Sequence, residues 1–189
     1  TVQGVTYAYG EKVTSGGPWG RYALWLDDGT WSVTFAAPGC RPATIKVDLK
    51  AAAPRVRDIV LEPLPAKLAL AGTGRLGTRA TFTLTAANDA GLPYYIGTAL
   101  GTSPGQKVGS RTFPLNGDSL FLAALLMPGV FKGSLGWLDR SGRGRMEFAI
   151  PTWPVLAGNT FWFAGFTADY GYPFGVKSIS NPVGLKFIP

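Results

Sequence analysis

The chain has 189 residues, enough for one large or two small domains, and 46% of them are hydrophobic while only 15% are charged. Its formal net charge of +7 suits acidic glycans, nucleic acid or a membrane surface, although ordinary solubility is the simpler explanation for scattered basic residues. Histidine is absent and cysteine occurs once, which excludes an internal disulfide and removes the commonest general base and zinc ligand.

The N-terminal part shows the period-two alternation of apolar and polar residues that indicates half-buried β-strands. Aspartate and glycine tolerate the backbone angles of tight turns, so Asp27-Asp28-Gly29 favours a hairpin between the first two strands. A closing strand is expected over 56–61. Three earlier strands are predicted from residues that share a face: Tyr22, Leu24 and Leu26; Trp31, Val33 and Phe35; Ile45, Val47 and Leu49.

Pro63 and Pro65 interrupt this pattern, and we expect a domain boundary there, with residues 1–63 before it and residues 64–189 after it. A new series of strands follows, separated by turns rich in glycine, asparagine and aspartate. The segment 119–126 is alternatively a short helix, because its apolar run lacks a clear period. The predicted strands cover 67–71, 78–86, 92–100, 119–126, 144–150, 160–168, 174–180 and 183–188.

About eight short strands with regular turns indicate a sandwich or jelly roll. The predicted fold class is therefore all-β, with two β-sandwich domains of which the second is jelly-roll-like. Gly and Pro are frequent, at 26 and 15 residues, which agrees with many turns and little helix.

The N-terminal part resembles the carboxypeptidase regulatory-like family of β-sandwich domains, which is transthyretin-like, over 20–24, 29–35, 37–40 and 58–63. Members usually open with a Gly-x-Val strand and then Pro-Val-x-Gly-Val-x-Val, and here Val2–Tyr7 matches only the second part. The resemblance implies a transthyretin-like or Ig-like sandwich that lacks its first strand.

A missing strand leaves a row of unpaired backbone groups, which is costly when it is buried. The gap is filled either by a segment that precedes residue 1 or by a strand from a neighbouring molecule. We place Val2, Val5, Tyr7 and Tyr9 at the strand-exchange interface, as the donor or as the lining of the acceptor. The strands expected over 56–61 and 183–188 are the other candidates for exchange.

The C-terminal part resembles a β-sandwich domain of secreted and surface bacterial proteins. The matching stretches are 138–144, 150–151, 156–161 and 179–181. This resemblance implies a secreted or cell-surface location and carries no activity with it. A secretory leader is not visible, so an exported protein would be present here in its mature or trimmed form.

The residues do not predict an enzyme. The acidic residues stand mostly in turns near glycine, where turn formation explains them; they include Asp27, Asp28, Asp89, Asp118 and Asp139. The loop at Asp139 lacks the alternating oxygen ligands of a calcium site and is predicted to be a tight turn. We therefore expect no catalytic residue, no metal site, no cofactor and, without a long apolar run, no membrane span.

Aromatic residues remain as candidate contacts with another molecule. Trp25 alternates with its apolar neighbours and is therefore expected to face outward. Trp162 is expected on the face of its strand opposite to two phenylalanines, and Tyr170 and Tyr172 lie in an aromatic loop. Exposed Trp and Tyr carry much of the energy of protein interfaces, and they also stack on sugar rings. A thick sandwich whose strands are covered by loops explains about half of these residues equally well.

Two functions fit these observations. The first is an extracellular structural protein, the repeating subunit of a surface fibre or pilus-like filament, assembled from copies of itself by β-strand donation. The alternative is a carbohydrate-binding or adhesive appendage of a larger secreted protein, with glycans as partners. We favour the first, because the alternative needs the missing strand to result from truncation; a nucleic-acid partner is not expected in either case.

Overall fold

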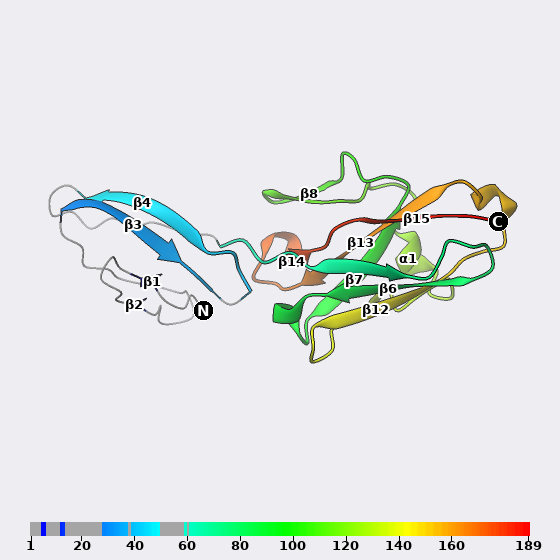
Figure 1. The fold of residues 1–189 in the computed structure, drawn as a ribbon, viewed down its shortest axis with the longest axis horizontal. Coiled ribbons are helices and arrows are strands. Elements are labelled where there is room, and N and C mark those ends of the chain that lie inside the picture. The colour runs from blue at the N-terminus through cyan, green and yellow to red at the C-terminus, as the bar shows by residue number, and fades with distance from the viewer. Residues whose placement is uncertain (1–4, 7–11, 14–27, 38, 50–58, 60) are drawn as a thin grey trace. The chain divides into compact units, whose positions relative to one another are not determined.

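The computed structural model describes residues 5–6, 12–13, 28–37, 39–49, 59 and 61–189. The chain divides into two compact units, Thr1–Leu64 and Pro65–Pro189. Open β-sheets dominate the described residues of both units, so the predicted all-β, sandwich-like fold class is confirmed (Figure 1). Within the described ranges, no helix has both the length and the apolar character needed to cross a bilayer.

The first unit contains a four-stranded antiparallel sheet in the order β2-β1-β3-β4. Its strands are β1 (Val5–Thr6), β2 (Lys12–Val13), β3 (Gly29–Phe35) and β4 (Ala43–Leu49). The longer strands β3 and β4 lie close to two of the predicted ones, whereas the strand predicted over 22–26 and most of 56–61 fall outside the described residues.

The alternation in β3 and β4 gives this sheet one apolar and one polar face. Val33 and Phe35 are buried and pack with half-buried neighbours that include Ile45 and Ile59. On the polar face, Thr30 donates a hydrogen bond to Asp48 at 2.5 Å, and the hydroxyls of Thr34 and Thr44 are 2.8 Å apart. Because directly opposed residues share a face, the register of the two strands produces this separation.

The second unit is a sandwich of two antiparallel sheets. One sheet has the order β10-β12-β6-β5, and the other has the order β11-β7-β13-β14, with β15 also paired to β13. The strands are β5 (Lys67–Ala71), β6 (Arg79–Thr85), β7 (Pro93–Ala99), β10 (Phe131–Lys132), β11 (Leu135–Trp137), β12 (Arg143–Ala149), β13 (Thr160–Ala168), β14 (Val176–Ile179) and β15 (Val183–Lys186).

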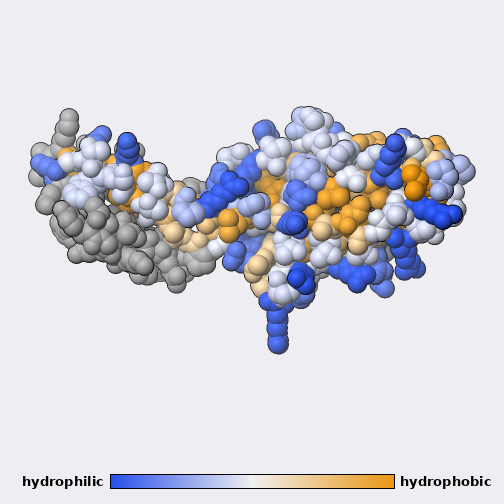
Figure 2. All heavy atoms as spheres, in the orientation of Figure 1, coloured by the Kyte–Doolittle hydropathy of each residue, from blue (hydrophilic) through white to orange (hydrophobic). Residues whose placement is uncertain are grey.

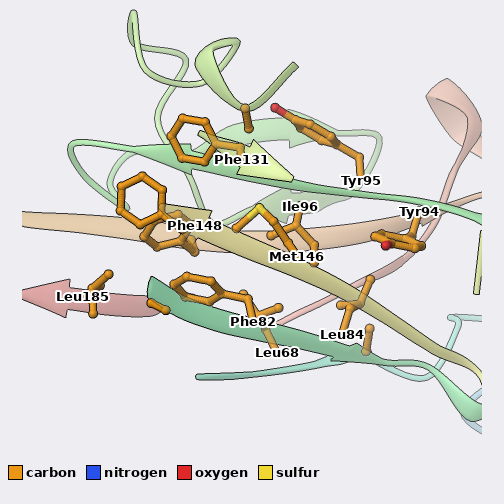
Figure 3. Packing of buried hydrophobic residues seen from close by; sticks show 14 of the residues in the cluster. Leu68, Phe82, Leu84, Tyr94, Tyr95, Ile96, Phe131, Met146, Phe148 and Leu185 are labelled. Atoms are coloured by element: carbon orange, nitrogen blue, oxygen red, sulfur yellow. The ribbon is translucent and has the colours of Figure 1, made fainter. Parts of the chain in front are cut away.

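Alternate residues of both sheets meet in one aromatic core, which Figure 3 shows from close by. Phe82 of β6 stacks on Phe163 of β13 with ring centroids 4.1 Å apart, and Phe148 of β12 stacks on Phe131 at 4.8 Å. Each fully buried Phe side chain contributes roughly 1.5–3 kcal/mol relative to an exposed one. The core therefore accounts for the period-two pattern that predicts these strands.

A second, smaller cluster explains why β13 is apolar on both faces. The hairpin of β8 (Gln106–Val108) and β9 (Arg111–Phe113) places Val108 and Phe113 against Ala164 of β13, together with Ala99 and Val176. Trp162 is half-buried at the margin of the same cluster. One face of β13 thus packs on the opposite sheet, while the other is covered by a hairpin that the sequence pattern does not predict.

The remaining differences from the predicted elements are local. The segment 119–126 forms turns and the helix α1 (Ala123–Leu126), so its interpretation as a helix is confirmed and its interpretation as a strand is wrong. The segment Val183–Lys186 pairs with β13 of its own chain, and Ile188 bridges to Arg75. One side of this strand is therefore engaged within the chain, and its exchange with a neighbour stays a prediction.

Candidate interaction surface

Strand β11 forms one edge of its sheet and, among the residues that the structure describes, pairs only with β7. Ile96 N donates to Ser134 O at 2.7 Å, and Leu138 N donates to Leu92 O at 2.9 Å. Backbone bonding alternates along an antiparallel pair, so the intervening N–H and C=O groups of Leu135 and Trp137 point away from β7. This edge therefore presents unpaired backbone groups.

The same two residues place large apolar side chains in solvent. Leu135 is 63% exposed and Trp137 is 73% exposed, and both lie on one side of the strand, opposite Tyr95 and Pro93 in the ladder. Leu135 and Trp137 therefore lie on the outer face of the sheet, beyond the part of that face that the β8–β9 hairpin covers. Large exposed apolar groups on an open sheet edge are unusual, because they favour pairing with another chain.

Helix α1 extends this apolar region. Ser134 Oγ, directly before β11, donates to Ala124 O of the helix at 2.6 Å, which holds the two elements side by side. The set of exposed side chains is named the α1–β11 surface and consists of Leu122, Leu125, Leu126, Met127, Leu135 and Trp137. Figure 2 shows that hydrophobic residues reach the surface of the second unit.

Two buried tyrosines fix the backbone beneath this surface. Tyr95 donates to Phe121 O at 2.6 Å, and burial raises its pKa to about 12. The Tyr94 hydroxyl lies 3.0 Å from both Gly133 O and Arg145 O and accepts a bond from Arg145 N at 3.2 Å. Burial also raises the pKa of Tyr94, against the opposing effect of the bond to the Arg145 backbone.

The Tyr94 ring further requires glycine on the neighbouring strand β12. A Cβ at Gly144 would lie 2.5 Å from this ring, closer than any real contact, so a side chain there would displace the tyrosine. Tyr94 and Tyr95 point to opposite faces of β7, as their sequence positions predict. Both therefore serve to hold β11 and α1 in place.

Among the aspartates predicted to form turns, Asp139 and Asp89 have different roles. Asp139 accepts hydrogen bonds from Ser141 Oγ at 2.6 Å, Ser141 N at 2.8 Å and Arg143 N at 3.0 Å, which confirms the predicted tight turn. The Ser141 hydroxyl and the Arg143 backbone N–H lower the pKa of this carboxyl, against a smaller opposing effect of desolvation. Within the described ranges, no three His, Cys, Asp or Glu residues gather as metal ligands would.

Asp89 has a role that its position in a turn does not reveal. It ends the short helix η1 (Ala87–Asp89) after β6, and its side chain is only 2% exposed. Lys177 Nζ of β14 lies 2.9 Å from Asp89 Oδ1, and Thr167 of β13 donates to Asp89 Oδ2 at 2.6 Å. The ion pair thereby ties the end of one sheet to two strands of the other.

The predicted site residues do not gather in one place. Val2, Tyr7, Tyr9 and Trp25 lie outside the described residues, and Val5 belongs to β1, between β2 and β3. The other three lie on or beside β13. Tyr170 is fully exposed, Tyr172 is half-buried with Lys177 Nζ 5.9 Å from its ring centre, and Trp162 is half-buried.

Trp162 stands near the beginning of β13, whereas the two tyrosines follow its end, so these aromatics are about 20 Å apart along the strand. The α1–β11 surface was not predicted. Its signal in the sequence was the alternation of Leu135 and Trp137 around Gly136.

Comparison of the chain with protein-family models, with characterised proteins and with solved structures gave no match.

Proposed function

We propose that this protein is a non-catalytic structural subunit of an extracellular assembly, built by contacts between β-sheet edges of neighbouring copies. The observation that carries the proposal is the open edge of β11 with its exposed Leu135 and Trp137. Unpaired backbone groups beside large apolar side chains supply both the hydrogen bonds and the buried area that strand addition uses. The resemblance to secreted surface proteins supports the extracellular location.

A second open edge in the first unit supports assembly from copies of the same chain. Strand β4 pairs only with β3 among the described residues, and its Ile45 and Val47 are incompletely buried. Contact between two different edges of successive copies is heterologous, so it builds a ring where the rotation closes and an open filament where it does not. We propose the filament. We propose that β4 of one copy adds to β11 of the next.

Of the predicted exchange segment Val2–Tyr9, the structure describes Val5 and Thr6. Val5 and Thr6 form β1, which pairs with β2 and with β3 of the same chain. In this arrangement β1 supports β3 and stays within its own chain.

The test is the molar mass of the protein in solution, measured by light scattering over a range of concentrations. The proposal predicts mass that increases with concentration, and filaments by electron microscopy at the upper end. The double variant Leu135→Lys with Trp137→Lys should stay monomeric, because two ammonium groups at the edge oppose its pairing.

The matched control is Trp153→Lys with Val155→Lys, at the exposed turn around η2 (Pro154–Leu156). These side chains are 59% and 76% exposed, similar to those of the α1–β11 surface, and they do not lie on a sheet edge. The control should assemble like the unmodified protein. A strictly monomeric unmodified protein, or equal loss of assembly in both variants, would contradict the proposal.

A further inference from the structure

The outer face of the sheet β10-β12-β6-β5 is polar along its whole length. Residues that alternate with the core residues of β5, β6 and β12 point outward, as their exposure pattern shows. This set is named the cation–threonine face and consists of Lys67, Arg79, Thr81, Thr83, Thr85, Lys132, Arg143, Arg145 and Glu147.

The register arranges these side chains in rows across the sheet. Arg143, Thr85 and Lys67 stand opposite one another on β12, β6 and β5. In the next row, Arg145 and Thr83 face Ala69 of β5. Threonines thus form a central column. Arg143, Arg145 and Glu147 stand along one side of it, and Lys67, Ala69 and Ala71 along the other.

Positive charge on this face exceeds negative charge. Five of its side chains are cationic and one, Glu147, is anionic. Glu147 lies 3.3 Å from Arg145 and 3.6 Å from Arg79, so it partly neutralises those two. Lys67, Lys132 and Arg143 form no ion pair with the described residues and remain available to an external anion.

The threonine column supplies hydroxyl groups beside these cations. Thr81 Oγ1 accepts a long bond of 3.5 Å from Arg145, while the hydroxyls of Thr83 and Thr85 have no partner among the described residues. A hydroxyl both donates and accepts, so it matches the hydroxyls of a sugar. Seven-residue strands make the face about 20 Å long, which suits an extended chain better than a single small molecule.

We propose that the cation–threonine face binds an extended acidic polysaccharide, whose carboxylate or sulfate groups pair with Lys67, Lys132 and Arg143, and with Arg145 in competition with Glu147, while its hydroxyls bond to the threonines. This site is independent of the α1–β11 surface and of the proposed assembly. Single-stranded nucleic acid usually needs aromatic side chains for base stacking, and this face carries none. It also carries no large apolar side chain for insertion into a membrane surface.

The test measures binding of alginate and dextran sulfate by calorimetry, with neutral dextran and duplex DNA as comparison ligands. The proposal predicts that at least one acidic polysaccharide binds, that added salt weakens it, and that dextran does not bind. The variant Arg143→Glu with Arg145→Glu should weaken binding by roughly tenfold or more. If it fails to fold, Arg143→Gln with Arg145→Gln replaces it.

Two further variants separate a defined site from general charge attraction. Lys107→Glu with Lys186→Glu makes the same change in net charge at exposed positions on β8 and β15, and it should have little effect. Thr83→Val removes one hydroxyl without changing charge and should weaken binding about threefold. Equal weakening by both charge variants, no effect of Thr83→Val, tighter binding of DNA, or no binding of either polysaccharide would overturn the proposal.

Discussion

Two sheet edges of the second unit, β5 and β11, differ in whether their outward backbone groups are hydrogen-bonded. On the β5 side, the amide of Asn181 bonds to the free edge: its Oδ1 accepts from Leu68 N at 3.0 Å and its Nδ2 donates to Leu68 O at 3.1 Å. Bridges from Ala66 to Ser180 and from Arg75 to Ile188 cover the ends of that edge. On the β11 side, the outward backbone groups of Leu135 and Trp137 have no such cover among the described residues.

This difference suggests why the two edges have different roles. An asparagine side chain imitates the donor and acceptor of a neighbouring strand, so it satisfies the β5 edge without offering it to another molecule. A bare edge with apolar side chains is an aggregation hazard unless something occupies it. Since one edge is covered and the other is not, the β11 edge is the better candidate for a contact between copies.

The largest loss of stability is expected from breaking the ion pair that ties the two sheets together. Replacing Asp89 with Ala leaves the half-buried Lys177 ammonium with only the more distant Asp169, at 3.9 Å, and removes the acceptor of the Thr167 hydroxyl. The free energy of unfolding should fall by about 3–5 kcal/mol, as measured by urea denaturation. As a control, the double variant Asp89→Leu with Lys177→Met should reduce the free energy of unfolding by less than either single change does. A loss below about 0.5 kcal/mol for Asp89→Ala would contradict this interpretation.

A smaller effect is expected from uncovering the β5 edge. Asn181→Ala removes two hydrogen bonds to Leu68 and should destabilise the protein by about 1–3 kcal/mol. It should also create a second associating edge, visible as a larger molar mass by light scattering. The matched control is Asn159→Ala, which removes one exposed bond to Val155 O. If Asn181→Ala behaves like that control in both measurements, the amide does not protect the edge.

The smallest expected effect is a dependence of stability on pH through Tyr95, which lies opposite Leu135 on the β11 side. Its pKa of about 12 in the folded protein exceeds the ordinary value of 10.0, so the folded state retains a proton that the unfolded state loses. The stabilisation is complete below pH 10 and is lost as the pH rises toward 12. Urea unfolding across this range should show the decline, and Tyr95→Phe should make it shallower. An equal slope in the variant would assign the decline to other groups.

Much of the second unit could be predicted from its sequence, because alternation reports directly on burial of one sheet face. The strand expected over 67–71 matches β5, and the one over 160–168 matches β13. The hairpin of β8 and β9 was missed because strands of three residues are too short to show a period. The apolar second face of β13 was visible in the sequence, but the element that covers it was not.

The contact residues were harder to predict, for two physical reasons. Leu135 and Trp137 alternate as any half-buried strand does, and no local signal shows that their side remains uncovered. Asp89 lies two residues before a glycine, in a sequence typical of turns, while its partner Lys177 lies far along the chain and meets it only through the packing of the two sheets. Pairings between distant residues cannot be predicted from periodicity alone.

Amide hydrogen exchange at low and high protein concentration tests the contrast between the two edges most directly. The amide of Leu68 bonds to Asn181 within the chain and should be protected equally at both concentrations. The outward amides of Leu135 and Trp137 should exchange rapidly at low concentration and become protected at high concentration, as copies associate. Exchange of Leu135 and Trp137 that stays equally rapid at both concentrations would contradict assembly through the β11 edge.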